Sequence, residues 1–255
     1  MFAAPMALIL LALGLLLAAI LALLLHKVRA IHLATYRLLD DADSTRREVE
    51  TLFVQLQALA ALERRLDLAG PLPPLRGWAG SPDFLLAVWE QIQRQRPQTV
   101  VECSSGASTL VIARALQQAG GGHVWSLEHE PIFASRTREL LQRHGLDGWA
   151  TVLDAPLQTT HTSTPWYREE ALPVDLPPVD LLVIDGPPGA VAPMARAPAL
   201  ERMLPRMAPS WVLLADDADR PDEAEMVEQW CARVAQLKLT RLPAEKGLVR
   251  LEMTP

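Results

Sequence analysis

Cysteine is scarce in this sequence: among its 255 residues there are two, Cys103 and Cys231, far apart in the chain. Two isolated cysteines exclude a disulfide framework and a cysteine-rich metal site, and they fit a reducing compartment. Positive charge is not in excess either, because 24 Lys and Arg stand against 30 Asp and Glu, for a formal net charge of −6. A chain with this balance has no global field that attracts nucleic acid, so we expect no nucleic-acid partner.

Charge is absent altogether from one long segment near the N-terminus. Residues 6–25 are almost entirely Leu, Ala and Ile, and about 20 such residues in a helix span the roughly 30 Å hydrocarbon core of a bilayer. A cleaved signal peptide would normally show a basic first region and a shorter apolar core. A buried helix of a soluble protein is the other alternative, and it would rarely be so uniformly apolar. Residues 1–26 are therefore predicted to be a transmembrane anchor.

Basic residues follow this segment, and none precedes it. Lys27, Arg29 and Arg37 come just after the apolar run, and an excess of Lys and Arg marks the cytoplasmic side of a membrane helix. We therefore expect a single-pass protein of the inner (cytoplasmic) membrane whose C-terminal bulk faces the cytoplasm.

Proline and glycine are absent from residues 26–68, where good helix formers dominate, so residues 27–69 are predicted to form a connecting helix. Its apolar residues recur at steps of three and four and make one stripe. The stripe consists of Val49, Leu52, Leu56, Leu59, Leu62 and Leu66. Two interpretations stay open: residues 49–66 form a coiled coil that makes a homodimer, or they pack on the chain's own globular domain.

A proline-rich break, Gly70-Pro71-Leu72-Pro73-Pro74, ends this helix, because proline removes a donor and disfavours helical backbone before it. We place a linker at 70–80 and a globular domain at 81–255.

Short apolar runs alternate with helical patterns throughout this domain. The alternation predicts an α/β fold with a Rossmann-like, doubly wound and mostly parallel sheet. The last two strand-like runs are joined by a short turn and must be antiparallel. The seven runs are 99–103, 123–127, 150–153, 179–184, 211–215, 238–242 and 248–253.

The first of these strands leads into a turn of small residues, 104–109, in which Gly106 is the only glycine. Small residues allow backbone N–H groups to approach a ligand closely. The scarcity of glycine disfavours a nicotinamide-dependent oxidoreductase, which would carry Gly-x-Gly-x-x-Gly here.

Polar side chains end the neighbouring strands, where open α/β sheets bind ligands. Glu128 ends the second strand, 22 residues after Gly106, and an acid there can accept hydrogen bonds from both hydroxyls of a ribose. The third strand ends in Asp154-Ala155, which could take an adenine amino group. The fourth ends in Asp185, on a rigid Gly-Pro-Pro-Gly turn.

Over roughly residues 78–253 the chain resembles the class I S-adenosylmethionine-dependent methyltransferase superfamily. It is most similar to a subgroup with a Glu-x-Gly-Ser-Gly-x-Ser-Thr loop, an Ile-Asp-Gly-Pro-Pro-Gly turn and a late Asp-Asp-x-x-Arg. This chain has the turn at 184–189 and the late motif at 216–220, and it departs from the loop pattern at Ser104, where the subgroup has glycine.

The resemblance implies S-adenosylmethionine as the cofactor and a set of residues that hold it. The predicted cofactor residues are Glu102, Ser104, Gly106, Ser108 and Thr109 at the methionine part, Glu128 and His129 at the ribose, Asp154 and Ala155 at the adenine, and Asp185. Asp185 and Asp216 are the predicted catalytic residues, as general bases for a hydroxyl acceptor.

Asp185 and the pair Asp216-Asp217 also occupy the places at which catechol-type O-methyltransferases, in the same superfamily, hold a divalent cation. Three carboxylates would suit a hard cation. The subgroup that the motifs resemble is not associated with metal dependence. An acidic cleft without a metal, in which Arg220 pairs with Asp217 or Asp219, is therefore favoured over a bound divalent cation.

The predicted function is methyl transfer from S-adenosylmethionine, by O-methylation of a small-molecule or lipid-linked, membrane-associated acceptor. Residues 158–178, with Trp166 and Tyr167, are long for a loop and are the predicted acceptor lid. The alternatives are a catalytically degenerate membrane scaffold, for which Ser104 is the main support, and the nicotinamide-dependent oxidoreductase.

Overall fold

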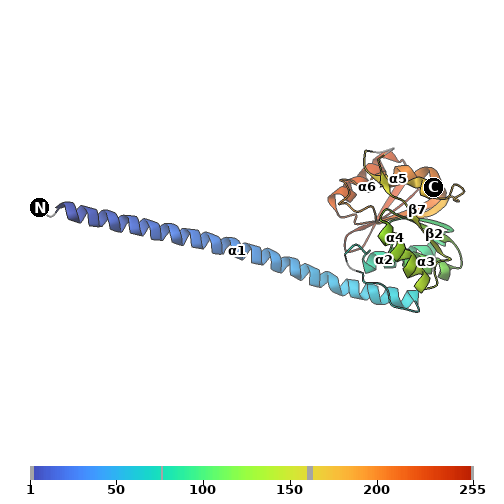
Figure 1. Ribbon diagram of the computed structural model, residues 1–255, viewed down its shortest axis with the longest axis horizontal. Helices are drawn as coiled ribbons and strands as arrows, with labels where there is room; N and C mark the ends of the chain where they lie inside the picture. Colours follow the sequence, from blue (N-terminus) through green and yellow to red (C-terminus); the bar gives the residue numbers. More distant parts are fainter. Residues whose placement is uncertain (1–2, 76, 160–162, 254–255) are drawn as a thin grey trace. The chain divides into compact units, whose positions relative to one another are not determined.

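The computed structural model of the protein describes residues 3–75, 77–159 and 163–253. They form two compact units, Met1–Phe53 and Val54–Pro255, coloured along the chain in Figure 1. The boundary falls inside one uninterrupted helix, α1 (Ala3–Leu66), so the predicted anchor and connecting helix are continuous. Leucine and alanine, which dominate its first part, are among the best helix formers.

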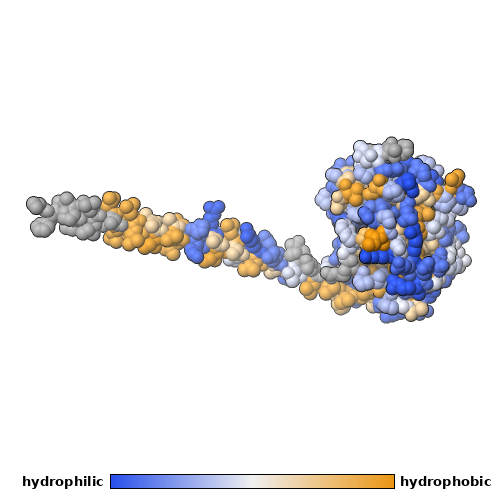
Figure 2. Space-filling view, in the orientation of Figure 1, coloured by the Kyte–Doolittle hydropathy of each residue, from blue (hydrophilic) through white to orange (hydrophobic). Residues whose placement is uncertain are grey.

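One stretch of α1, Leu13–Ala42, is long and apolar enough to cross a membrane, with a mean hydropathy of 1.9. It is the one such helix among the described residues, and it lies near the N-terminus. A signal sequence near the N-terminus can have the same length and hydropathy. Figure 2 shows the apolar surface of its first part giving way to hydrophilic residues further along the helix.

The second unit is built on a seven-stranded sheet in the order β3-β2-β1-β6-β7-β9-β8. The first five strands in this order pair in parallel, and β9 pairs antiparallel with both β7 and β8. This confirms the predicted fold class, including the C-terminal antiparallel hairpin. The strands are β1 (Thr99–Cys103), β2 (His123–Glu128), β3 (Ala150–Asp154), β6 (Val179–Ile184), β7 (Met207–Asp216), β8 (Leu237–Leu242) and β9 (Leu248–Met253).

Helices cover both faces of the sheet. Alternate strand residues point to opposite sides, and both sides carry apolar residues that need cover. Val100 joins the core cluster under α2, α3 and α4, whereas its neighbour Val101 joins the cluster under α5 and α6. The five helices, which Figure 1 labels, are α2 (Pro82–Gln95), α3 (Ala107–Ala119), α4 (Pro131–Arg143), α5 (Pro198–Met203) and α6 (Pro221–Arg233).

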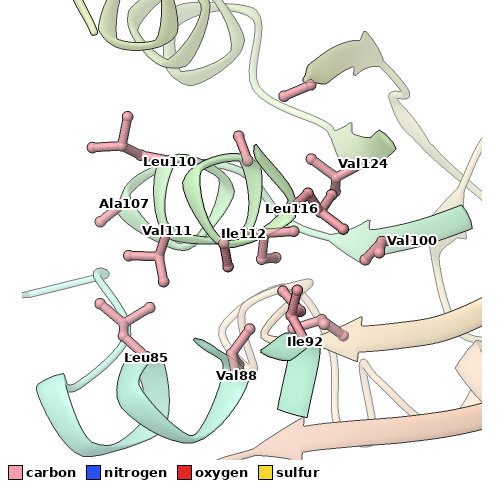
Figure 3. Close-up of a cluster of buried hydrophobic side chains, with 14 of the residues drawn as sticks. Leu85, Val88, Ile92, Val100, Ala107, Leu110, Val111, Ile112, Leu116 and Val124 are labelled. Atoms are coloured by element: carbon pink, nitrogen blue, oxygen red, sulfur yellow. The ribbon is translucent and has the colours of Figure 1, made fainter. Parts of the chain in front are cut away.

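The contact between α2 and α3 forms the centre of the first cluster. Leu85, Val88 and Ile92 of α2 lie against the apolar side of α3, which includes Val111 and Ile112 (Figure 3). Each of these side chains is fully buried, and burying one such side chain contributes about 1.5–3 kcal/mol to stability. This packing fixes α3 and the β1–α3 turn that precedes it.

The end of α1 also packs into this cluster. Leu62 and Leu66 are fully buried, and the side chains of Arg114 and Gln118 donate hydrogen bonds to the Leu66 carbonyl over 2.7 and 3.1 Å. These bonds satisfy a carbonyl that a helix end leaves without a partner. This part of the stripe therefore packs on the chain's own domain, while Leu56 stays exposed. A homodimer through residues 49–66 stays a prediction.

Smaller elements complete the domain. The predicted lid forms a two-stranded antiparallel sheet of β4 (Leu157–Gln158) and β5 (Trp166–Tyr167), followed by the short helix η1 (Glu169–Ala171). A second short helix, η2 (Leu204–Arg206), precedes β7. Residues 160–162 of the predicted lid lie outside the described residues.

Candidate active site

A cavity of about 390 Å³ opens at the carboxyl ends of the central strands. This is within the usual size range of ligand sites. The predicted site residues that line it are Ser104, Ser108, Glu128, His129 and Asp185. The structure thus brings together the ends of β1, β2 and β6 as the sequence predicts.

The turn after β1 keeps a glycine-like backbone even at Ser104. Ser104 has a φ of 133° and Gly106 a φ of 146°, in a region that side-chain-bearing residues avoid at a cost of about 1–3 kcal/mol. The Ser104 amide donates a hydrogen bond to the Leu127 carbonyl over 3.1 Å, which ties the turn to β2. Ser104 therefore adopts a backbone conformation that glycine adopts readily.

Glu102 supports this turn from behind. Its side chain is fully buried, and its Oε2 accepts hydrogen bonds from the hydroxyls of Thr109 (2.7 Å) and Ser126 (2.6 Å). The Thr109 hydroxyl in turn accepts one from the Gly106 amide over 3.0 Å. Burial raises the pKa of Glu102 to about 7, although hydroxyl hydrogen bonds oppose the rise. Glu102, Gly106 and Thr109 are not among the described residues that line the cavity.

Glu128 lines the cavity as an ionised carboxylate. Its oxygens accept hydrogen bonds from the Ser105 hydroxyl (2.8 Å) and the Glu130 amide (3.0 Å), and His129 Nδ1 lies 3.2 Å from Oε1. Burial alone would raise the pKa of Glu128, but these partners outweigh it and hold the pKa below its ordinary value. An ionised carboxylate in a cavity can accept hydrogen bonds from ligand hydroxyls.

The end of β3 is placed differently. The side chain of Asp154 is 56 % exposed and forms an ion pair with Arg138, Oδ2 to Nη2 over 2.9 Å. Ala155 is buried, and its amide donates to the Glu128 carbonyl over 2.7 Å. Neither residue is among the described lining residues, so the adenine role of both stays a prediction.

Three carboxylates gather where β6 and β7 end. One oxygen each of Asp185, Asp216 and Asp217 lies within 4.8 Å of the others. Burial raises the pKa of Asp185 to about 7 despite the nearby charge of Arg196. Burial and the neighbouring carboxylates raise the pKa of Asp216 to about 8. Asp185 and Asp217 line the cavity, whereas Asp216 is not among the described lining residues.

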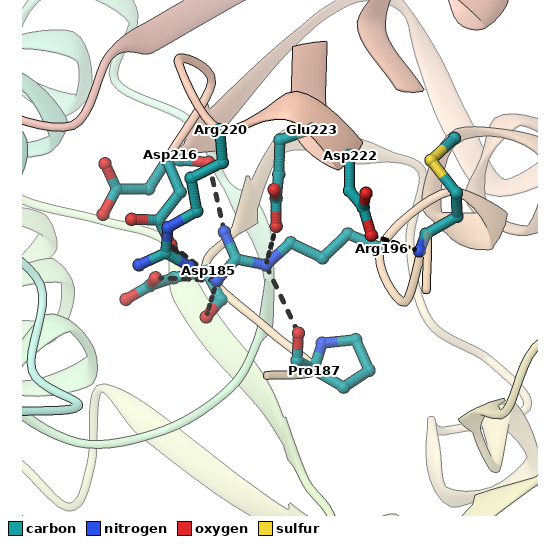
Figure 4. Close-up of polar contacts among 9 residues, drawn as sticks. Asp185, Pro187, Arg196, Asp216, Arg220, Asp222 and Glu223 are labelled. Carbon is teal, nitrogen blue, oxygen red and sulfur yellow. Dashed lines mark hydrogen bonds and ion pairs between the residues drawn. The ribbon is translucent and has the colours of Figure 1, made fainter. Parts of the chain in front are cut away.

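Arg196, which lies before α5, is the site residue that sequence reasoning missed most clearly. Its guanidinium is 4 % exposed and lies among the carboxylates, with Nη2 2.8 Å from Asp217 Oδ2 and 3.6 Å from Asp185 Oδ1 (Figure 4). One signal was present in the sequence, since Arg196 is the only charged residue between Asp185 and Glu201.

The carboxylate cluster meets the distance requirement for a divalent cation, but cationic side chains already hold one of its oxygens. The Arg196 guanidinium lies 2.8 Å from Asp217 Oδ2, so its positive charge opposes a second cation at that oxygen. Asp217 Oδ2 is also held by Arg220 Nη1 at 2.9 Å. With both guanidiniums in place, Asp217 Oδ2 does not fit the ligand role that a resident divalent cation would need.

Tyr167 of β5 is a second residue that the sequence did not single out as a ligand contact. It is buried, it lines the cavity, and its hydroxyl has no hydrogen-bond partner among the described residues. Burial raises the pKa of Tyr167 well above its ordinary value, so the hydroxyl is a neutral donor. A buried hydroxyl without a partner is costly unless a ligand satisfies it.

The predicted lid is anchored next to Tyr167. Glu169 of η1 binds Arg202 of α5 with both carboxylate oxygens, over 2.6 and 3.0 Å. Such a two-point bond fixes orientation as well as position.

Other lining residues come from separate segments, and of the four named here only Arg220 was placed in the cleft by the sequence. Trp78 from the linker and Phe133 from α4 contribute apolar surface, and Lys246 and Arg220 contribute positive charge. Trp78 is 77 % exposed, so much of its ring is open to solvent.

Comparison with known proteins gives a family match over residues 101–218, to a family described as a methyltransferase domain. No curated protein matches the chain.

Many solved structures share the fold. An O-methyltransferase from Bacillus cereus in complex with SAH is 20 % identical, with a TM-score of 0.56 over 78 % of this chain and 91 % of that one. A SAH-bound methyltransferase from Podospora anserina is 14 % identical, with a TM-score of 0.56 over 78 % and 88 %. The O-methyltransferase TomG from Streptomyces achromogenes, in complex with SAM, is 16 % identical, with a TM-score of 0.50 over 79 % and 89 %. At these identities the likeness is one of fold.

Proposed function

We propose that this chain, whose residues 101–218 match a family described as a methyltransferase domain, transfers a methyl group from S-adenosylmethionine to a hydroxyl oxygen. The observation that carries the proposal is that one cavity is lined both by the ionised Glu128 and by Asp185, a carboxyl whose pKa lies near neutrality. The first can hold the hydroxyls of a cofactor, and the second can remove the acceptor's proton.

The cofactor half of the cavity lies between β1 and β2. Ser104, Ser105 and Ser108 border it at the N-terminus of α3, where backbone N–H groups and the helix dipole favour a carboxylate. Glu128 accepts the ribose hydroxyls. Asp154 and Ala155 complete the site at the adenine if a bound cofactor reaches past Glu128.

Asp185 acts as the general base. A base works best when its pKa is near the operating pH, and Asp185 combines a pKa of about 7 with a place in the cavity lining. Its carboxylate takes the acceptor's proton while the new oxygen–methyl bond forms, the sulfur–methyl bond breaks and a neutral thioether leaves. Asp216 is the weaker candidate of the two, because it is 1 % exposed and is not among the described lining residues.

The acceptor half is open, apolar at Trp78 and Phe133, and positively charged at Lys246 and Arg220. These groups suit a hydroxylated acceptor with an apolar body. The apolar part of α1 anchors the chain as a single span in the inner membrane, with the domain in the cytoplasm, as the basic residues after it favour. This location supports a lipid-linked or membrane-associated acceptor.

Calorimetric titration of the full chain in detergent with S-adenosylmethionine, S-adenosylhomocysteine and NAD tests the cofactor. We expect the first two to bind and NAD not to bind. Binding of NAD alone would indicate the oxidoreductase, and no binding at all would indicate the degenerate scaffold.

Incubation of membrane extracts with the chain and methyl-labelled S-adenosylmethionine then identifies the acceptor. We expect the label in an alkali-stable methyl ether, the product of methylation at a hydroxyl oxygen. An alkali-labile methyl ester would indicate a carboxylate acceptor and would contradict the hydroxyl. Label confined to amines would contradict the oxygen acceptor.

A further inference from the structure

The donors of Arg196 are directed at the two strand ends that carry the acidic cluster. Nη1 donates to the Asp216 carbonyl and Nη2 to the Asp185 carbonyl, each over 3.1 Å. Nε donates to the Pro187 carbonyl over 3.3 Å (Figure 4). One planar cation thereby joins the backbone at the ends of β6 and β7.

The same guanidinium carries the positive charge that the acidic side chains need. Nη2 donates to Asp217 Oδ2 over 2.8 Å and lies 3.6 Å from Asp185 Oδ1, and Nε lies 3.8 Å from Glu223 Oε1. The side chains of Arg196 and its three acidic neighbours are nearly buried, with exposures of 4 to 11 %. Buried carboxylates of this kind require a close positive partner.

We infer that Arg196 is the resident cation of this site, a positioning residue that orients Asp185 and Asp217 and takes the place of a divalent metal. A guanidinium suits the task because its donors are fixed in one plane and its charge is permanent. A metal could bind Asp217 Oδ2 only after displacing a side chain that is itself almost fully buried. Its presence in the chain makes the proposed O-methylation independent of added metal.

Two oxygens of the acidic cluster remain without a partner beside Arg196. Asp216 Oδ1 and Asp217 Oδ1 are buried without a hydrogen-bond partner among the described residues. They are free either for an acceptor or water, or for a metal. Metal binding must therefore be measured on the chain itself.

The first experiment measures Mn²⁺ binding to the full-length chain in detergent by electron paramagnetic resonance, after treatment with a chelating resin. No cofactor or acceptor is needed. We expect no saturable site up to about 1 mM Mn²⁺, the weak end of protein cation sites. One Mn²⁺ per chain with a micromolar dissociation constant would overturn the inference, whether or not the chain proves to be a methyltransferase.

The second experiment removes the guanidinium. Arg196→Ala should create a Mn²⁺ site that the wild type lacks, because the carboxylates lose their cation. It should also lower kcat by at least about 100-fold while the affinity for S-adenosylmethionine stays within about threefold. Arg196→Lys should recover part of kcat. The same Arg→Ala change at Arg233, an exposed residue of α6, should alter none of these quantities.

The inference rests on the proposed function only for the effect on kcat. A variant Arg196→Ala that folds, binds no Mn²⁺ and keeps its kcat would overturn the inference even if methyl transfer is confirmed. If Arg196→Ala does not fold, the methyl transfer of the wild type is measured in the presence of a chelator. Unchanged activity would support the inference. Activity that the chelator abolishes and Mg²⁺ restores would overturn the inference.

Discussion

The hydroxyl of Tyr167 lies against Gly186 so closely that no side chain fits between them. A Cβ built on Gly186 would lie 2.5 Å from the Tyr167 hydroxyl oxygen and 3.1 Å from the Cys103 carbonyl oxygen. The glycine of the Gly-Pro-Pro-Gly turn is therefore required by close approach. It lets the lid residue Tyr167 reach the cavity beside Asp185.

Gly186→Ala should consequently displace Tyr167 and distort the end of β6. We expect a loss of about 1–3 kcal/mol in the free energy of unfolding, the usual cost of overpacking, and a turnover reduced by at least about tenfold. Chemical denaturation and methyl-transfer assays measure the two effects. The matched control is Gly189→Ala in the same turn, where a Cβ meets no atom within 4 Å. Equal effects of the two substitutions would contradict the close-approach argument.

Tyr167→Phe removes the unpartnered hydroxyl and leaves the ring in place. Because a buried polar group without a partner costs about 1–3 kcal/mol, the variant should be as stable as the wild type or more stable. If the hydroxyl donates to the cofactor or acceptor, the corresponding dissociation constant or KM should rise by about 5- to 20-fold. Thermal unfolding and calorimetry separate the two effects. Unchanged binding of both ligands would show that the hydroxyl contacts neither.

Glu102→Gln should change how stability depends on pH. The folded-state pKa of Glu102, about 7, lies above the ordinary value of 4.5, so the folded state binds this proton more tightly than the unfolded state does. Its contribution is therefore fully present below about pH 4.5 and is lost as the pH rises to about 7. When the pH rises from about 5 to about 8, the free energy of unfolding should fall by up to about 3 kcal/mol less in the variant than in the wild type. Glu228→Gln, at an exposed position, is the control and should behave like the wild type.

Leu62→Ala tests whether the end of α1 belongs to the domain. Leu62 is fully buried in the core cluster, and truncating such a side chain costs about 2–5 kcal/mol. Leu56→Ala, six residues earlier at a 54 % exposed position, should cost less than about 0.5 kcal/mol. A large loss of stability at Leu56 that depends on protein concentration would instead indicate that a second copy covers the exposed stripe.

Much of this fold could be predicted because each strand is a short apolar run between turn signals, and because chain connectivity decides parallel or antiparallel pairing. The site could be predicted because the carboxyl ends of parallel strands meet at one edge of the sheet. Glu128 and Asp185 are placed by the sheet itself, at positions that do not depend on how loops pack.

The residues that were missed are positioned by packing between distant segments. Tyr167 reaches the cavity because its loop folds back as β5, and Trp78 reaches it from the linker before α2. Arg196 is placed by hydrogen bonds to the carbonyls of Asp185 and Asp216, which no local pattern encodes. Asp154 was predicted as a site residue from its place at a strand end, but it pairs with Arg138. That pairing could not be predicted from the strand end alone.

The central claim is that Asp185 removes the acceptor's proton during methyl transfer from S-adenosylmethionine. The most direct measurement is the transfer of labelled methyl groups into membrane extracts by the wild type and by Asp185→Asn, across a range of pH. Because the base must be ionised and its pKa is about 7, kcat/KM of the wild type should rise with pH through about 7 and then level off. Asp185→Asn should bind S-adenosylmethionine normally and transfer at least about 100-fold more slowly. Unimpaired transfer by Asp185→Asn, with the same pH dependence as the wild type, would contradict the claim.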